Sequence, residues 1–191
     1  KMIEDQQLRD RHGLGALPDD LTHRDKKAVY RSGFSGDTHW VNMEFTISTA
    51  ADQTAVAPGN LLREWQDNGR RHFHYKLNRP TVFLPAMVSA RYAVQQDSWN
   101  GVDISVLYHR RHSYNVERMI DAAKSALALM TEQFGPYPYD HLRIVEFPRF
   151  RDFAQSFPGT VPFSEGLGFI IEVDEDDPDA INLPYFVTAH E

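Results

Sequence analysis

The period of the hydrophobic pattern changes near Ser113, and this change restricts the possible folds more than any other feature. Before it, in WVNMEFTIS at 40–48, apolar and polar residues alternate, which is typical of a strand with one buried face. We therefore predict the α+β class, with a β part followed by an α/β part. After Ser113, apolar residues recur at helical spacing: Ile120, Ala123, Leu127, Met130 and Phe134.

Two Asn-Gly pairs predict where the β part turns. Asn68-Gly69 and Asn100-Gly101 each lie between two strand-like runs. The Asn-Gly pair tolerates positive φ, which two-residue hairpin turns need. We expect tight turns at both pairs, within an antiparallel, sandwich-like β domain at 38–112.

The α/β part at 113–191 carries start and stop signals for helices. Asn115 is placed to cap a helix that Gly135 ends. Pro184 predicts the first turn of a second helix. A domain boundary is expected near 109–113. Strands are expected at 142–147 (LRIVEF) and 168–173 (GFIIEV).

Composition excludes several classes of protein. Among the 191 residues, 20 Lys and Arg face 27 Asp and Glu, a formal charge of -7, which argues against a nucleic-acid surface. The absence of Cys excludes disulfides and thiolate metal sites, and no apolar run reaches the ~18 residues of a membrane span. Residues 1–37 are polar, and we expect them to be partly helical, with one short helix that Gly13 ends. We expect a soluble fragment whose two ends are cuts through a longer polypeptide.

His190-Glu191 is the first motif with chemical meaning. Zinc hydrolases use H-E-x-x-H on a helix, where the first His binds the metal and the adjacent Glu is the general base for metal-bound water. Only the first two letters are present here. An ordinary helix with a solvated Glu is the alternative interpretation of the pair.

The sequence SEGLGFI at 164–170 is the second motif. If it forms an edge strand, Gly166 and Gly168 would let an extended peptide approach and pair. Glu165 would then meet the ammonium group of a free peptide amino terminus. The alternative interpretation is a loop that enters an edge strand, where the glycines admit unusual dihedral angles.

Together the two motifs resemble the aminopeptidase N family of zinc exopeptidases, the gluzincin group of membrane alanyl aminopeptidases. SEGLGFI resembles the M-E-N-W-G-L-V form of the family's G-x-M-E-N element. Glu165 matches the glutamate that binds the substrate's amino terminus and Gly168 the later glycine, whereas Ser164 and Gly166 replace the family's Met and Asn. His190 and Glu191 match the first zinc ligand and the general base.

The resemblance runs from about residue 38 to the end. It implies that 38–112 is the end of the family's N-terminal β domain, and that 113–191 begins a thermolysin-like peptidase domain. FGPYPYDHLRIVEFP resembles the helix end and strand that precede the G-x-M-E-N element. ADQTAVAPGNLLREW, RIVEFPRF and FAQSFPGTVPFSE resemble a bacterial subgroup in which the peptidase-like domain is joined to a permease of the ABC-2 transporter type.

This resemblance implies a zinc metallopeptidase in the parent protein, which would bind Zn²⁺ and peptides with a free amino terminus. The rest of the polypeptide would span a membrane and tether the domain. The second His and the third ligand would follow residue 191, so we expect this fragment to be inactive and to hold no zinc tightly. The alternative is a non-catalytic extramembrane domain of a transporter-type protein that binds a peptide or a partner.

Other candidate sites have simpler explanations. His72 and His74 share one face of a strand, and His109 and His112 lie three residues apart, so either pair could touch a metal or simply be exposed. The acidic run at 172–179 lacks the spacing of a calcium loop. Ser164 lies outside any G-x-S-x-G sequence, which argues against a serine hydrolase.

Overall fold

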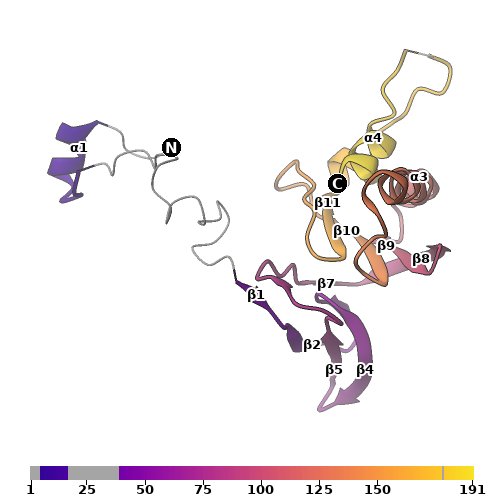
Figure 1. Cartoon of the computed structure of the whole chain (residues 1–191), viewed down its shortest axis with the longest axis horizontal. Helices are drawn as coiled ribbons and strands as arrows, with labels where there is room; N and C mark the ends of the chain where they lie inside the picture. Colours follow the sequence, from indigo (N-terminus) through magenta and orange to yellow (C-terminus); the bar gives the residue numbers. More distant parts are fainter. Residues whose placement is uncertain (1–4, 17–38, 178) are drawn as a thin grey trace. The chain divides into compact units, whose positions relative to one another are not determined.

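The computed structural model describes residues 5–16, 39–177 and 179–191 (Figure 1). The chain divides into two compact units, 1–39 and 40–191. In the first unit, helix α1 (Gln6–Arg11) begins after Asp5, whose side chain accepts a hydrogen bond from the Leu8 N–H at 2.7 Å. Gly13 follows with a φ of +66°, so the predicted short helix is confirmed; residues 1–4 and 17–37 of the predicted segment lie outside the described residues.

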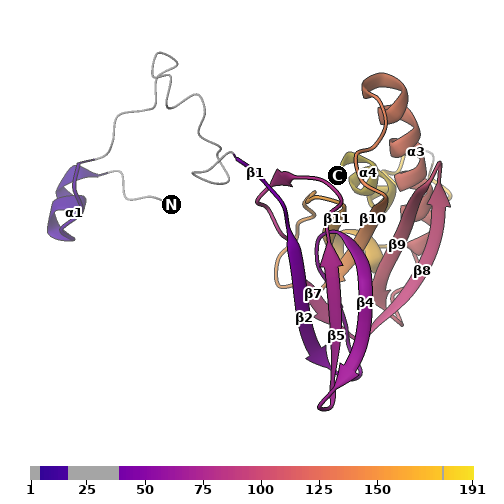
Figure 2. The same cartoon turned by 60° about the horizontal axis from the view of Figure 1, so that its bottom comes forward.

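The second unit contains an antiparallel sheet in the order β2-β5-β4 (Figure 2). Phe45 and Ile47 of β2 are partly buried and pack against Phe73 and Tyr75 of β5, which confirms the alternation seen in the sequence. Two short antiparallel pairs, β1 with β6 and β3 with β7, accompany it. The strands are β1 (Trp40–Val41), β2 (Glu44–Ala50), β3 (Thr54–Val56), β4 (Asn60–Asp67), β5 (Arg70–Lys76), β6 (Thr81–Val82) and β7 (Val88–Ala90).

Both predicted hairpin turns are confirmed, although the second lies in a mixed sheet and not in the antiparallel β domain that the sequence predicted. Asn68 and Gly69 have φ of 48° and 73°, and Asn100 and Gly101 have φ of 45° and 83°. The residues that flank each pair face one another across the hairpin. Positive φ at both central positions is the geometry that an Asn-Gly turn supplies.

A second, mixed sheet has the order β11-β10-β9-β8. Strands β8 (Tyr92–Trp99) and β9 (Val102–His109) form the second hairpin. Strand β9 runs parallel to β10 (His141–Phe147), which runs parallel to β11 (Thr160–Ser164). Helix α3 (Val116–Phe134) connects β9 to β10, because parallel neighbours need a crossover. The mixed sheet contains strands from both sides of residues 109–113, where the sequence predicted a domain boundary. These residues lie within the compact unit 40–191.

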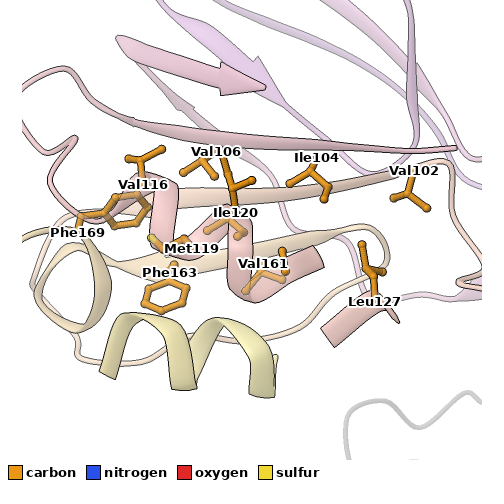
Figure 3. Packing of buried hydrophobic residues seen from close by; sticks show 12 residues of the cluster. Val102, Ile104, Val106, Val116, Met119, Ile120, Leu127, Val161, Phe163 and Phe169 are labelled. Carbon is orange, nitrogen blue, oxygen red and sulfur yellow. The ribbon is translucent and has the colours of Figure 1, made fainter. Parts of the chain in front are cut away.

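Both faces of the mixed sheet are covered. On one face, β9 side chains lie opposite α3 (Figure 3). On the other, Leu107 and Val145 pack with Val56 of β3, so this unit has an α/β arrangement with a β layer behind it. The α+β class is confirmed. The buried residues of the first face are Val102, Ile104, Val106, Val116, Met119, Ile120, Ala123, Leu127, Ile144, Val161, Phe163 and Phe169.

The strand predicted at 168–173 is wrong. The chain instead forms strand β11 at 160–164 and then a single π-helical turn, η1 (Glu165–Phe169). Asn115 directs this outcome, because its buried Nδ2 donates to the carbonyls of Gly168 at 2.7 Å and Ile171 at 2.9 Å. Asn115 does precede α3, but within the described residues its side chain makes no capping bond.

The outer edge of β11 is covered by residues 153–157. The Ser164 N–H donates to the Phe153 carbonyl at 3.0 Å, and the Gln155 N–H donates to the Pro162 carbonyl at 3.2 Å. Pro162 is tolerated here because it has no N–H to offer the outer side of an edge strand. The outer side of β11 is therefore occupied by the chain itself, and the edge strand at 168–173 on which a peptide was expected to pair does not form.

Helix α4 (Leu183–His190) ends the described chain, and it confirms the helix predicted near Pro184. The Asn182 side chain accepts a hydrogen bond from the Tyr185 N–H at 3.2 Å, which caps the first turn. Helix α4 packs on α3 and η1. Among the described residues, no helix combines the length and apolar character needed to cross a membrane.

Candidate functional site

His190 and Glu191 lie at the C-terminal end of α4 and line a pocket of about 140 Å³ between α3, β10 and α4. The Ser156 hydroxyl donates to the Glu191 carbonyl at 2.5 Å. The buried Thr188 hydroxyl finds no hydrogen-bond partner within the described residues. The other walls are mostly apolar: Ala123, Ala126, Leu127, Met130, Tyr137, Leu142, Ile144 and Val161.

Glu165 lies outside the residues that line this pocket. It is the first residue of η1, and its Oε1 accepts a hydrogen bond from the Arg149 N–H at 3.0 Å. Its Oε2 lies 3.9 Å from His112 Nδ1. The structure therefore places His190 and Glu191 together at the end of α4. Glu165, in the π-helical turn η1, instead contacts Arg149 and lies near His112.

Close packing accounts for one of the two glycines of the motif, Gly168. A Cβ atom at Gly168 would lie 2.6 Å from Phe163 Cε1 and 3.2 Å from Met119 Cε, and one at Gly166 would lie 2.6 Å from Arg149 Cδ. The 2.6 Å distances are shorter than real Cβ contacts. At Gly168 the neighbours are fully buried, whereas at Gly166 the neighbour is the flexible end of the exposed Arg149 side chain, which can move. Close packing therefore requires glycine at 168 but not at 166, and no strand in this segment presents either glycine to a peptide.

His112, Glu146 and Glu165 form a cluster in which one ligand atom from each lies within 4.8 Å of the others. His112 Nδ1 makes a short hydrogen bond with Glu146 Oε1. The other carboxylate oxygen of Glu146 accepts the His109 N–H at 2.5 Å. Glu146 is only 5% exposed, whereas His112 and Glu165 are each 24% exposed, so the cluster opens to solvent on one side.

The charge of Glu146 also reaches Tyr92. The Tyr92 hydroxyl donates to the Glu146 carbonyl oxygen at 3.1 Å. Burial, with a further contribution from the negative charge of Glu146, raises the pKa of Tyr92 to about 12. Tyr92 is therefore a neutral hydrogen-bond donor behind the cluster at any physiological pH.

Sequence reasoning did not find this cluster, because its residues come from three separate segments: the loop after β9, strand β10 and η1. The sequence did contain one indication of the cluster, Glu146 within LRIVEF. A carboxylate inside a buried apolar strand needs hydrogen-bond or charge partners. His112 was noticed only together with His109. Their rings do lie close, with centroids 4.6 Å apart, but Glu146 is the more direct partner of His112.

The remaining candidates have structural explanations. The ring of His72 stacks on Trp65 with centroids 5.0 Å apart, and His74 Nε2 pairs with Glu44 at 2.7 Å. In the acidic run, Asp174 accepts hydrogen bonds from the N–H groups of the two aspartates that follow it within the turn.

The fold and these two sites define an α+β protein with a helix-end His-Glu pocket and a separate His-Glu-Glu cluster. No family model and no curated protein matches the chain.

Proposed function

We propose that this chain is part of a zinc-dependent aminopeptidase-like protein that hydrolyses N-terminal peptide bonds with metal-activated water. One observation carries the proposal: His190 and Glu191 close a pocket at the end of α4, and η1, which begins with Glu165, packs against the same helix. The proposal includes the finer fold assignment, in which 113–191 begins a thermolysin-like domain. It also includes a membrane-tethered parent of the ABC-2 permease type.

The residues around His190 do not by themselves fit a zinc ion. Catalytic zinc takes three protein ligands and one water. Within the part of the chain that the structure describes, the group of three potential ligands is His112, Glu146 and Glu165, and it does not include His190. We therefore derive no catalytic step through zinc. The proposal requires that further ligands come from elsewhere in the parent polypeptide.

Each site residue has one assigned role in the proposal. His190 is the first metal ligand, Glu191 the general base, and Glu165 the anchor for the substrate's ammonium group. Gly166 and Gly168 shape the turn that carries Glu165. Helix α4 packs against η1. This contact supports the assignments, because side chains from two elements that pack together can reach the same substrate.

The test uses the longer parent protein, with the residues that follow 191. The Glu191→Gln variant should lose hydrolysis of every peptide. The Glu165→Ala variant should lose about 10- to 100-fold in kcat/KM for peptides with a free amino terminus, since a charge-assisted contact contributes about 1.5 to 3 kcal/mol. Peptides with an acetylated amino terminus should lose much less. Equal losses for both kinds of peptide would show that Glu165 does not bind the amino terminus.

A second candidate function is a non-catalytic binding domain. It is favoured by the position of Glu165, which lies beside His112 and outside the pocket of His190. In this case the parent protein would bind free-amino peptides or a partner without cleaving them. Calorimetric binding of a peptide that stays intact after prolonged incubation with the parent protein would support this candidate over the enzyme.

A further inference from the structure

We propose that His112, Glu146 and Glu165 bind one divalent transition-metal cation, with Zn²⁺ as the ion of choice for testing. This site does not include His190, the metal ligand of the proposed peptidase. The inference does not depend on the proposed peptidase function. The three side chains converge from the loop after β9, from β10 and from η1, with their ligand atoms within 4.8 Å of one another.

The two carboxylates are arranged alike. Each has one oxygen fixed by a backbone N–H, from His109 in the case of Glu146 and from Arg149 in the case of Glu165. Each directs its other oxygen toward His112 Nδ1. Backbone donors that hold one oxygen while the second remains available are the kind of outer contact that orients metal ligands.

The distances allow a cation to enter with small movements. Zinc lies about 2.0 to 2.2 Å from nitrogen and oxygen ligands, so the ligand atoms of a tetrahedral site are about 3.3 Å apart. His112 Nδ1 and Glu165 Oε2 are 3.9 Å apart, too far for a hydrogen bond. His112 Nδ1 and Glu146 Oε1 are in direct contact. The cation would replace the proton that these two atoms share and draw Glu165 inward.

Charge favours the same occupant. Two carboxylates face one imidazole, so one negative charge stays uncompensated within the cluster even when His112 is protonated. The exposed side of His112 and Glu165 gives an ion a route from solvent. One nitrogen and two carboxylate ligands without sulfur suit Zn²⁺ and related first-row ions better than Mg²⁺ or Ca²⁺, which prefer oxygen alone.

The site would change the role of Glu165. In the proposed peptidase, this carboxylate binds a peptide ammonium group. A cation held by the same carboxylate would compete with that ammonium group, so the cluster would couple metal supply to substrate binding.

The test is a calorimetric titration of the 191-residue chain with ZnCl₂ at neutral pH. The wild-type chain should bind one equivalent at this cluster, which replaces the expectation, drawn from the truncated His190 motif alone, that the fragment holds no zinc tightly. The His112→Gln and Glu165→Gln variants should each bind about 10- to 100-fold more weakly or not at all, since even loss of an outer contact has effects of this size. Glu165→Gln retains an oxygen for the Arg149 N–H, so the turn keeps its anchor.

Two matched variants make the result decisive. His74→Gln removes a half-buried His that pairs with a single carboxylate, and His190→Gln removes the proposed catalytic ligand; both should leave the affinity unchanged. If only His190→Gln weakens binding, the inference is overturned and the metal belongs to the proposed peptidase site. An absence of binding, or equal affinity in all variants, also overturns it, while the assignment of His190 remains open to the peptidase assay. Thermal melting checks that each variant is folded. If His112→Gln is unfolded, the zinc affinity of Glu165→Gln decides the test.

Discussion

Gly168 is fixed by the two buried side chains that enclose its α-carbon. Replacement by Ala would bring the new Cβ to 2.6 Å from Phe163 and 3.2 Å from Met119, both of which are fully buried. We expect Gly168→Ala to lower the free energy of unfolding by about 1 to 3 kcal/mol, the usual range for overpacking. Urea denaturation measures it. Gly15→Ala, at a position with nothing within 4 Å, is the control; an equal effect at both sites would contradict the steric explanation.

His141 makes the fold sensitive to acid. It is buried, its Nδ1 donates to Asn60 Oδ1 at 2.9 Å, and its Nε2 has no hydrogen-bond partner in the described part of the chain. Burial, and then the positive charge of Arg143, lowers the pKa of His141 to about 3. The unfolded chain, with a His pKa of about 6.5, binds this proton first. Stability from His141 is therefore complete above pH 6.5 and is lost as the pH falls toward 3.

The linkage gives a measurable difference between pH 7 and pH 5. From these two pKa values, His141 lowers the free energy of unfolding by about 2 kcal/mol as the pH falls from 7 to 5. The His141→Gln variant should lose about that much less than the wild-type chain, by urea denaturation at both pH values. His12→Gln, at an exposed position, serves as the control. An identical pH dependence in His141→Gln and the wild-type chain would show that His141 is not the responsible group.

At the scale of single elements, Asn115 links α3 to η1. Its two N–H bonds go to the carbonyls of Gly168 and Ile171. Asn115→Asp keeps the shape but removes both donors, leaving buried carbonyls unpaired beside a carboxylate. We expect a loss of about 2 to 4 kcal/mol in the free energy of unfolding, together with faster amide exchange in η1.

Asn182→Asp is the matched control for this substitution. Asn182 caps α4 through its oxygen, which an Asp carboxylate replaces equally well. The same chemical change should therefore be nearly neutral there. A similar loss at both positions would mean that the effect of Asn115→Asp comes from added charge alone.

Elements with local signals were predictable, and elements set by distant contacts were not. The turns at Asn68-Gly69 and Asn100-Gly101 follow from two residues each, so the sequence pattern located them correctly. Strand β11 escaped prediction, because Pro162 is typical of a loop, and the strand is defined by parallel pairing with β10, which forms only when the chain has folded. The His112 cluster escaped for the same reason, since its residues meet only after β9, β10 and η1 are in place.

At the scale of the 40–191 unit, the two sheets share contacts that should make them unfold together. Val56 packs with Leu107 and Val145 from the other sheet. Arg143 of β10 donates to the Gly59 carbonyl at 2.9 Å and lies over the Tyr75 ring at 5.4 Å. Unfolding of the three-stranded sheet would therefore leave the charge of Arg143 without these partners. Because of this, the stability of each sheet depends on the other.

We predict one cooperative unfolding transition for residues 40–191. Trp65 in β4 and Trp99 in β8 report on the two sheets, so variants that retain one or the other can be followed by fluorescence in urea. Their midpoints should coincide. Arg143→Met should lower both midpoints by the same amount. Two separate midpoints would instead support the domain boundary near 109–113.

The covering of β11 also bears on how copies of the protein behave in concentrated solution. On its outer side, the Thr160 and Ser164 N–H groups are already bonded within the chain, and Pro162 has none to offer. Sheets recruit other molecules through edges with free backbone groups. The outer side of β11 is thus closed to pairing with another copy, and the open edge of this four-stranded sheet is β8. That edge exposes Gln96, Asp97 and Ser98, whose polar side chains disfavour stacking between molecules.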